Sequence, residues 1–256
     1  MGIIAAAVSY LKRIGYTGTY VPTLDTLTAI AALHPRAIPF ENLDVLLGRP
    51  PRLDLASLRA KLVASRRGGY CYEHASLCAA ELEALGFTVA RHSARVVMAT
   101  PREQAPRTHM FLTVLDHVID PGFGGQAPQA PVPLDGARTL GGHRIVRTRD
   151  GIELWYRDQI LWISSLEHDI PVDFEMANHY TATYPSSWFV QRLMLARATP
   201  EGATRLLNRE LTIERGKETT KRTIEDRADL QQVLDKLFDI ECDVSQLRVP
   251  TIPEWG

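Results

Sequence analysis

The spacing of apolar residues predicts that the first third of the chain is helical. Apolar positions within 55–65 recur at helical spacing, and Asp54 is placed to cap that helix, which we expect to end at Gly68-Gly69. An earlier helix over 24–33 is expected to stop before His34-Pro35. A further helix closes at Gly86, and its apolar face recurs at steps of four, three, four and three residues through Cys71, Ala75, Cys78, Leu82 and Leu85.

After Gly86 the apolar period shortens to that of strands. Strands are expected within 87–98, 110–115, 118–124 and 161–163, and Asp150-Gly151 is expected to join strands 143–149 and 152–157 as a hairpin. The Pro- and Gly-rich stretch 125–142 is typical of a surface loop. Residues 173–198 have a mixed or helical pattern, and strand-like stretches 203–214 and 218–224 precede a helix at 228–238. The order predicts an α+β fold, with helices first, a β-rich middle and a small α/β tail.

Composition narrows the class of protein. Of the 256 residues, 45% are apolar and 23% are charged, which excludes disorder, collagen and coiled coil. The 29 basic and 30 acidic residues leave a net charge of −1, so no basic face for nucleic acid is expected. The apolar run 3–8 is too short to span a membrane, and no charged segment precedes it as in a signal peptide. Three cysteines do not build a disulfide framework, so we expect a reducing, cytoplasmic compartment.

Cys71 is the candidate nucleophile because it stands where a glycine loop enters a helix. The first helical turn has unpaired N–H groups and the positive end of the helix dipole, and both favour a thiolate. Arg66 and Arg67 lie just upstream and add positive charge. A buried cysteine commonly packs as a small apolar side chain, and we assign that role to Cys78 and Cys242.

A nucleophilic cysteine needs a base, and the base needs an orienting group. His109 opens one predicted strand and Asp120 ends the next, so the two side chains meet if the strands are neighbours. A lone histidine in a strand, or an aspartate before proline, more often has a structural role, so the pattern alone leaves both interpretations open. No metal site is expected, because among Cys71, His74 and Cys78 only the last two are one helical turn apart.

Six segments together resemble the arylamine N-acetyltransferases. RRGGYCYEHASL at 66–77 resembles the family's Arg-Gly-Gly-aromatic-Cys-x-Glu motif, and IPFENLDVLLGR at 38–49 resembles its Pro-Phe-Glu-Asn segment. RTHMFLTV at 107–114 and VIDPGFGG at 118–125 resemble the segments that carry the catalytic histidine and aspartate. NHYTATYPSSWF and RTIEDRADLQQVLDKLFDI, at 178–189 and 222–240, resemble later landmarks, so the resemblance spans nearly the whole chain.

The resemblance implies a fold in three parts around a Cys-His-Asp core like that of cysteine proteases. These are a helical bundle at 1–86 with the nucleophile, a β-barrel at 87–190 with the histidine and aspartate, and an α/β lid at 191–256. The implied site comprises catalytic Cys71, His109 and Asp120, a structural ion pair of Arg67 and Glu41, and substrate-binding Phe40, Phe123 and Gly124. Two positions depart from the family: Ala75 replaces the usual asparagine, and Pro121 follows the aspartate.

The implied reaction belongs to xenobiotic metabolism. An acetyl group moves from acetyl-CoA to an arylamine, arylhydrazine or N-hydroxyarylamine through an acetyl-cysteine, in ping-pong order. Acetyl-CoA is then a co-substrate and no tightly bound cofactor is expected; neither nucleic acid nor membrane is an expected partner. The alternatives are an amide synthase of a polyketide pathway, a thiol hydrolase or transglutaminase-like enzyme, and a binding protein that has lost its activity.

Overall fold

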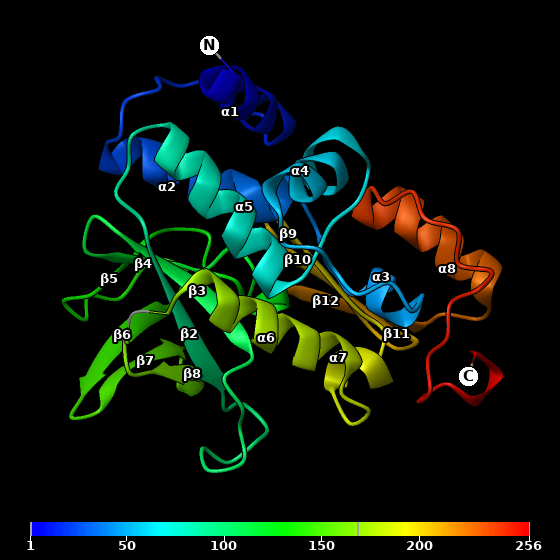
Figure 1. Ribbon diagram of the computed structural model, residues 1–256. Helices are drawn as coiled ribbons and strands as arrows, with labels where there is room; N and C mark the ends of the chain where they lie inside the picture. Colours follow the sequence, from blue (N-terminus) through cyan, green and yellow to red (C-terminus); the bar gives the residue numbers. More distant parts are fainter. Residues whose placement is uncertain (1, 168, 256) are drawn as a thin grey trace.

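Helices dominate the first third of the chain (Figure 1). The computed structural model describes residues 2–167 and 169–255. The N-terminal helical elements are α1 (Gly2–Arg13), α2 (Leu24–Ala37), α3 (Leu43–Leu46), α4 (Leu55–Leu58), the π-helical segment η1 (Arg59–Ala64) and α5 (Cys71–Ala84). The predicted cap is confirmed, because the Asp54 carboxylate accepts a hydrogen bond from the Ser57 N–H at 3.0 Å. The apolar faces of α1, α2 and α5 share one core with strand β3 (His109–Val114).

The predicted end of the second helix is wrong. α2 continues through His34-Pro35 and ends at Ala37. Pro35 lies in the last turn, where its missing N–H removes only one helical hydrogen bond. The fully buried His34 side chain is held by Tyr10 and by His74, and these tertiary contacts outweigh the local preference against helix before proline.

The middle of the chain forms a seven-stranded antiparallel sheet in the order β5-β4-β3-β2-β8-β7-β6. Its further strands are β2 (Ala90–Val96), β4 (His117–Ile119), β5 (Val132–Pro133), β6 (His143–Thr148), β7 (Gly151–Tyr156) and β8 (Gln159–Ser164). The edge strands β5 and β6 contact each other, so the sheet curls into a nearly closed barrel. The stretch predicted as a loop, 125–142, contains strand β5, which forms because the buried Val132 packs inside the barrel. The short turn η2 (Gly124–Gln126) overlaps the start of this stretch.

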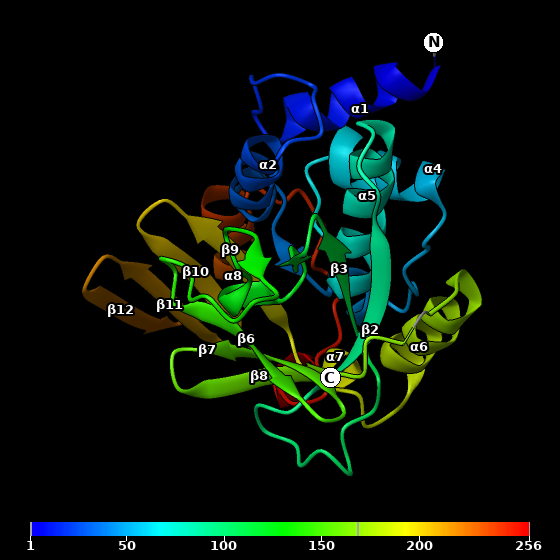
Figure 2. The same ribbon diagram turned by 90° about the vertical axis from the view of Figure 1, so that its left-hand side faces the viewer.

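The predicted hairpin is confirmed. Strands β6 and β7 pair from His143↔Tyr156 to Thr148↔Gly151, so the two turn residues are Arg149 and Asp150, one residue earlier than the predicted Asp150-Gly151. Figure 2 shows α5 alongside β3. The catalytic candidates on the helix and on the sheet therefore face one another across this contact.

The C-terminal part begins with helices α6 (Pro171–Thr183) and α7 (Trp188–Gln191), which are followed by a second sheet in the order β1-β9-β10-β11-β12. Its strands are β1 (Phe40–Glu41), β9 (Met194–Thr199), β10 (Gly202–Leu207), β11 (Glu210–Arg215) and β12 (Glu218–Thr223). The stretch predicted as one strand, 203–214, is a hairpin, and Asn208 takes the left-handed backbone (φ 53°) at its turn. Strand β1 pairs with β9, so the N-terminal part contributes to this sheet.

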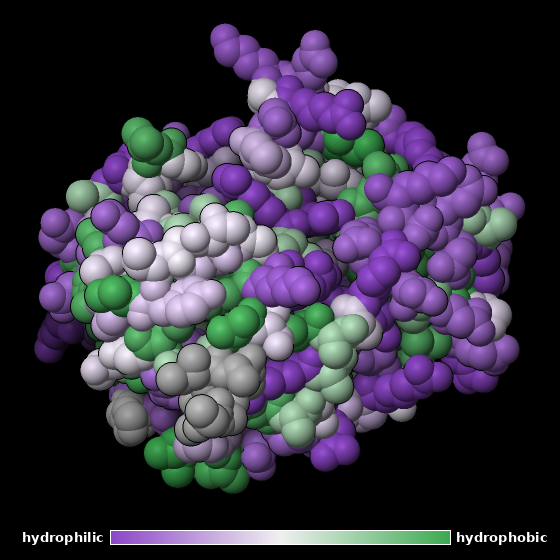
Figure 3. All heavy atoms as spheres, turned by 90° about the horizontal axis from the view of Figure 1, so that it is seen from above, coloured by the Kyte–Doolittle hydropathy of each residue, from purple (hydrophilic) through white to green (hydrophobic). Residues whose placement is uncertain are grey.

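The chain ends in helix α8 (Arg227–Val233), the π-helical segment η3 (Leu234–Phe238) and the short turn η4 (Pro253–Trp255). Figure 3 shows a largely hydrophilic surface on the side of the molecule where α8 lies. Arg66 pairs there with Asp235 and Asp239, at 2.8 Å in each case. Within the described residues, no helix is long and apolar enough to cross a membrane.

Candidate active site

Cys71 is the first residue of α5, and its side chain is buried. The loop before it passes tightly against β1, because a Cβ at Gly68 would lie 1.9 Å from the carbonyl oxygen of Pro39. The Glu73 carboxylate accepts a hydrogen bond from the Tyr70 N–H at 3.1 Å and so caps the helix one residue before the thiol. Close packing of the loop and capping of the helix together fix where the thiol stands.

His109 and Asp120 meet, as the neighbouring strands allow. His109 begins β3, and Asp120 directly follows β4, which pairs with β3 from Leu112↔Ile119 onward. His109 Nε2 lies 2.9 Å from Asp120 Oδ2, and both side chains are almost fully buried. With Nε2 bonded to the carboxylate, Nδ1 is the ring nitrogen left for another group.

Cys71 lies beside the strand end that carries His109. Its Sγ is 3.6 Å from the carbonyl oxygen of Thr108, the residue before His109. The loop after Asp120 presses on the start of α5, since a Cβ at Gly122 would lie 2.7 Å from Cys71 Cα. The structure therefore brings together the three residues that the sequence singled out as nucleophile, base and orienting group.

The electrostatics of this cluster favour a charged histidine. Burial by itself lowers the pKa of His109, but the Asp120 carboxylate and then Cys71 outweigh it and raise that pKa to about 10. A charged imidazole is therefore favoured beside the Cys71 side chain. Burial raises the pKa of Cys78, further along α5, to about 12, which keeps that side chain a thiol.

Trp162 is a member of the site that sequence reasoning missed. Its indole N–H donates a hydrogen bond to Asp120 Oδ2 at 2.8 Å, beside His109. The ring is fully buried and stacks on Phe111 with 4.2 Å between centroids. Trp162 comes from β8, which is not paired with β4, so no spacing in the sequence links it to Asp120.

The predicted substrate-binding residues lie beside this cluster and are partly exposed. The Phe123 ring meets His109 edge to face, with 5.1 Å between centroids. Gly124 lies against Phe40, because a Cβ there would be 3.4 Å from the Phe40 ring. Phe189, which sequence reasoning did not single out, lies 6.2 Å from Phe40 between ring centroids. These groups form an aromatic surface next to the histidine.

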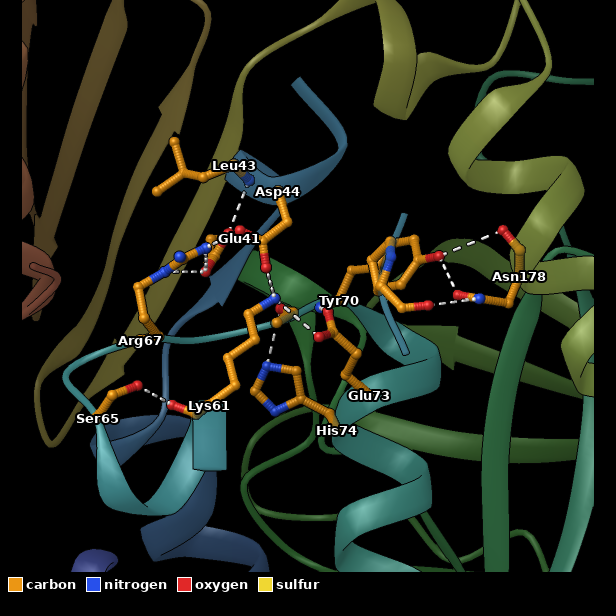
Figure 4. Close-up of polar contacts among 12 residues, drawn as sticks. Glu41, Leu43, Asp44, Lys61, Ser65, Arg67, Tyr70, Glu73, His74 and Asn178 are labelled. Atoms are coloured by element: carbon orange, nitrogen blue, oxygen red, sulfur yellow. Dashed lines mark hydrogen bonds and ion pairs between the residues drawn. The ribbon is translucent and has the colours of Figure 1, made fainter. Parts of the chain in front are cut away.

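Arg67 and Glu41 belong to a larger ion network behind the thiol (Figure 4). Arg67 donates to Glu41 Oε1 from Nε at 3.0 Å and from a terminal nitrogen at 2.8 Å, and that terminal nitrogen also lies 2.8 Å from Asp44. Lys61 bonds Asp44 at 2.7 Å and Glu73 at 2.8 Å. We call Glu41, Asp44, Lys61, Arg67 and Glu73 the ion network.

The ion network holds three carboxyl groups against two cations. Burial and the neighbouring Glu41 raise the pKa of Glu73 to about 7, although Lys61 and the Tyr70 N–H act in the opposite direction. Burial therefore disfavours the charged form of Glu73 even though Lys61 lies 2.8 Å from it. The sequence signal for this residue was its place three residues after Tyr70, where a capping carboxylate is favoured.

The two departures from the family pattern lie in buried positions. Ala75 is fully buried in the helical core, and Pro121 is buried in the turn between Asp120 and Gly122. Neither position interrupts the contact between His109 and Asp120. In the described part of the chain, no group of three or more His, Cys, Asp or Glu is arranged to hold a metal ion.

Comparisons with known proteins cover nearly the whole chain. A family model described as N-acetyltransferase matches residues 23–247. The arylamine N-acetyltransferase of Mycobacterium tuberculosis is 37% identical over 249 residues, which cover 91% of this chain and 88% of that protein. That of Escherichia coli is 36% identical over 248 residues, with the same coverage of 91% and 88%. The structure of Mycobacterium marinum arylamine N-acetyltransferase in complex with CoA superposes with a TM-score of 0.86 and 34% identity, over 97% of this chain and 94% of that chain.

Proposed function

This chain belongs to the arylamine N-acetyltransferase family, and on that premise we propose that it carries an acetyl group on Cys71 from acetyl-CoA to an arylamine, arylhydrazine or N-hydroxyarylamine. The observation that carries the proposal is the meeting of three buried side chains at the start of α5. Cys71 lies beside the histidine strand, and His109 is bonded to Asp120 at 2.9 Å. Relatives that share most of the chain's length bear the name of this activity.

In the first step, the Cys71 thiolate attacks the carbonyl carbon of the acetyl-CoA thioester. A new C–S bond forms, the C–S bond to CoA breaks, and His109 gives its proton to the departing CoA sulfur. The backbone N–H of Cys71 stands in the first turn of α5, where N–H groups have no partner within the helix, and it would donate to the transient oxyanion. One thioester replaces another, so the step is nearly balanced in free energy.

In the second step, an unprotonated aromatic amine attacks the acetyl-cysteine. A C–N bond forms, the C–S bond to Cys71 breaks, and His109 takes the proton that the nitrogen loses. Asp120 holds the imidazole in one tautomer and stabilises its charged form, and Trp162 holds Asp120. The enzyme then returns to its first state, which gives ping-pong kinetics.

The surface that Phe40, Phe123 and Gly124 form beside His109 is suited to the acceptor ring. These residues flank His109 and remain partly exposed. CoA is consumed in the reaction, so acetyl-CoA acts as co-substrate, in keeping with the CoA complex of the Mycobacterium marinum relative. A reducing compartment such as the cytoplasm would keep Cys71 as a free thiol.

The test separates the two half-reactions. Incubation with acetyl-CoA and no acceptor should release one CoA per protein and place one acetyl group on the peptide that contains Cys71, as mass spectrometry would detect. Addition of an arylamine should then remove that group as the N-acetyl product. Cys71→Ser should abolish both steps, whereas Cys242→Ser, at a partly exposed thiol, should leave them intact.

Acetylation at another residue, or turnover by Cys71→Ser, would overturn the proposal. Loss of the acetyl group to water faster than to any amine of a panel would instead indicate a hydrolase.

A further inference from the structure

A chain of three neutral side chains runs through the helical core to the start of α5. Tyr10 Oη lies 2.7 Å from His34 Nδ1, and His34 Nε2 lies 2.7 Å from His74 Nδ1. His74 Nε2 lies 3.2 Å from the carbonyl oxygen of Pro39 and 3.0 Å from that of Gly69. All three side chains are fully buried. We call Tyr10, His34 and His74 the histidine chain.

The two carbonyl groups fix the direction of every hydrogen bond in the histidine chain. A carbonyl oxygen only accepts, so His74 Nε2 must carry a hydrogen. Burial keeps both rings neutral, because it lowers the pKa of His74 to about 4, against the carbonyls, and lowers that of His34 well below its ordinary value. His74 Nδ1 is then a bare acceptor for His34 Nε2–H, and His34 Nδ1 is a bare acceptor for the Tyr10 hydroxyl.

His74 joins the two backbone segments that position the reacting groups. The Pro39 carbonyl directly precedes Phe40, and the Gly69 carbonyl lies two residues before Cys71. The segments also pair with each other, because the Gly69 N–H donates to Pro39 O at 3.2 Å and the Glu41 N–H donates to Gly69 O at 2.7 Å. The His74 ring further stacks on the Phe40 ring, 6.4 Å apart and 14° from parallel.

The histidine chain also connects this junction to the rest of the bundle. Tyr10 comes from α1, His34 from α2 and His74 from α5, three residues after Cys71. Figure 4 shows His74 at the start of α5, near Lys61 and Glu73. A shift of α1 would therefore reach the loop before Cys71 through three directed hydrogen bonds, and a shift of α2 would reach it through two.

We propose that His74, whose Nε2–H donates to the carbonyls of Pro39 and Gly69 and whose Nδ1 accepts from His34, is a positioning residue for acetyl transfer. It holds the loop of Cys71 and the strand of Phe40 in one geometry, and it touches neither substrate nor reacting atoms. The inference rests on the proposed function, since it concerns how that reaction is positioned. Misplacement of a reacting group by about 1 Å can reduce a rate about 100-fold, so a small movement of this junction is enough for a large effect.

The first test measures which ring nitrogens of His34 and His74 are protonated. Long-range ¹⁵N–¹H spectra of the whole protein at neutral pH should show His34 and His74 both neutral, with the hydrogen on Nε2. His34→Gln and His74→Gln assign the signals by their disappearance. A charged ring, or a hydrogen on Nδ1 of either residue, would overturn the assignment of direction.

The second test reads the effect on the reaction. Rapid-mixing measurements of Cys71 acetylation by acetyl-CoA should give a rate about 10- to 100-fold lower for His74→Leu, a smaller loss for His34→Leu and the smallest loss for Tyr10→Phe. His34→Gln keeps an N–H donor toward His74 and should recover part of the rate that His34→Leu loses. The value of KM for the amine should rise in His74→Leu, because Phe40 loses its support.

A matched control separates positioning from stability. His92 is also buried and bonds Thr113 Oγ1 at 2.9 Å, but it lies on β2 in the barrel. His92→Gln should lower the free energy of unfolding while the acetylation rate stays at the wild-type value, with every variant assayed where circular dichroism shows it folded. If wild-type Cys71 is not acetylated, the proposed function fails. If it is, and folded His74→Leu reacts at the wild-type rate, this inference alone fails.

Discussion

The ion network and the histidine chain hold the same loop by opposite electrostatic means. The ion network binds the loop through Glu73, which accepts from the Tyr70 N–H, and through Arg67, which pairs with Glu41. The histidine chain binds it through His74, which donates to the carbonyls of Pro39 and Gly69. One group is made of partly or fully buried charges, and the other is made of groups that must stay neutral.

The difference shows two ways to bury polar groups next to a reactive thiol. Buried charges are tolerated when each has several partners, and in the ion network Glu73 has both Lys61 and the Tyr70 N–H, yet its burial still raises its pKa. Neutral groups avoid this problem, but each atom must then find a partner of the right kind, and one misplaced hydrogen would leave two acceptors facing each other. The ion network is destabilised when one of its partners is lost, whereas the histidine chain is destabilised when one of its rings gains a proton.

The largest expected effect is the removal of a cation from the ion network. Lys61→Met leaves Glu73 and Asp44 each without one cation, and loss of one partner of a buried ion pair costs about 3–5 kcal/mol. Urea denaturation should show this loss in the free energy of unfolding. The matched control is Lys221→Met, because the Lys221–Glu210 pair is exposed and should cost less than about 1 kcal/mol. Equal losses in the two variants would contradict the role of burial.

A smaller effect is expected from the histidine chain. Tyr10→Phe leaves the buried His34 Nδ1 without its donor, and an unsatisfied neutral group costs about 1–3 kcal/mol. The same denaturation assay measures it, with the partly exposed Tyr180→Phe as control. If Tyr10→Phe lowers the free energy of unfolding as much as Lys61→Met does, breaking the histidine chain destabilises the protein as much as breaking the ion network.

The two groups should respond to pH with opposite signs. The pKa of folded Glu73, about 7, lies above its ordinary 4.5, so its contribution to stability is full below pH 4.5 and is lost as pH rises through 7. The pKa of folded His74, about 4, lies below its ordinary 6.5, so its contribution is present above pH 6.5 and is lost as pH falls through 4. Each slope is at most about 1.4 kcal/mol per pH unit for one proton.

Denaturation of wild type, Glu73→Gln and His74→Gln between pH 4.5 and 6.5 separates these slopes. As pH rises, the free energy of unfolding of the wild type minus that of Glu73→Gln should decrease. The free energy of unfolding of the wild type minus that of His74→Gln should increase. Slopes of the same sign would refute the contrast between the two groups.

The smallest expected effect is that of salt. Ions screen exposed pairs but reach buried ones poorly, so 1 M NaCl should change the cost of Lys61→Met by no more than a few tenths of a kcal/mol. The same salt should remove most of the cost of Lys221→Met. A cost of Lys61→Met that disappears in salt would place the ion network in contact with solvent.

Local pattern was enough to predict the elements that present the site. The glycine loop before Cys71, the cap at Asp54 and the β6–β7 hairpin each follow from neighbouring residues. His109 and Asp120 were within reach because one short turn separates their strands.

Contacts between distant residues could not be predicted in this way. Tyr10, His34 and His74 are separated by 24 and 40 residues, and Trp162 lies 42 residues from the Asp120 that it holds. In the sequence alone, each of these residues looks like an ordinary core residue, because its hydrogen-bond partner is known only from the folded structure. The same packing carries α2 through Pro35, against the local preference on which the prediction rested.

Gly122 limits how this site can be redesigned. Its backbone rests on Cys71 and His74, where a Cβ would lie 2.7 Å from Cys71 Cα and 3.2 Å from His74 Cβ. Any side chain at position 122 would therefore push on the backbone of the nucleophile itself. Laboratory evolution toward new acceptors should therefore accumulate changes around Phe40 and Phe189, and leave the Asp120 turn unaltered.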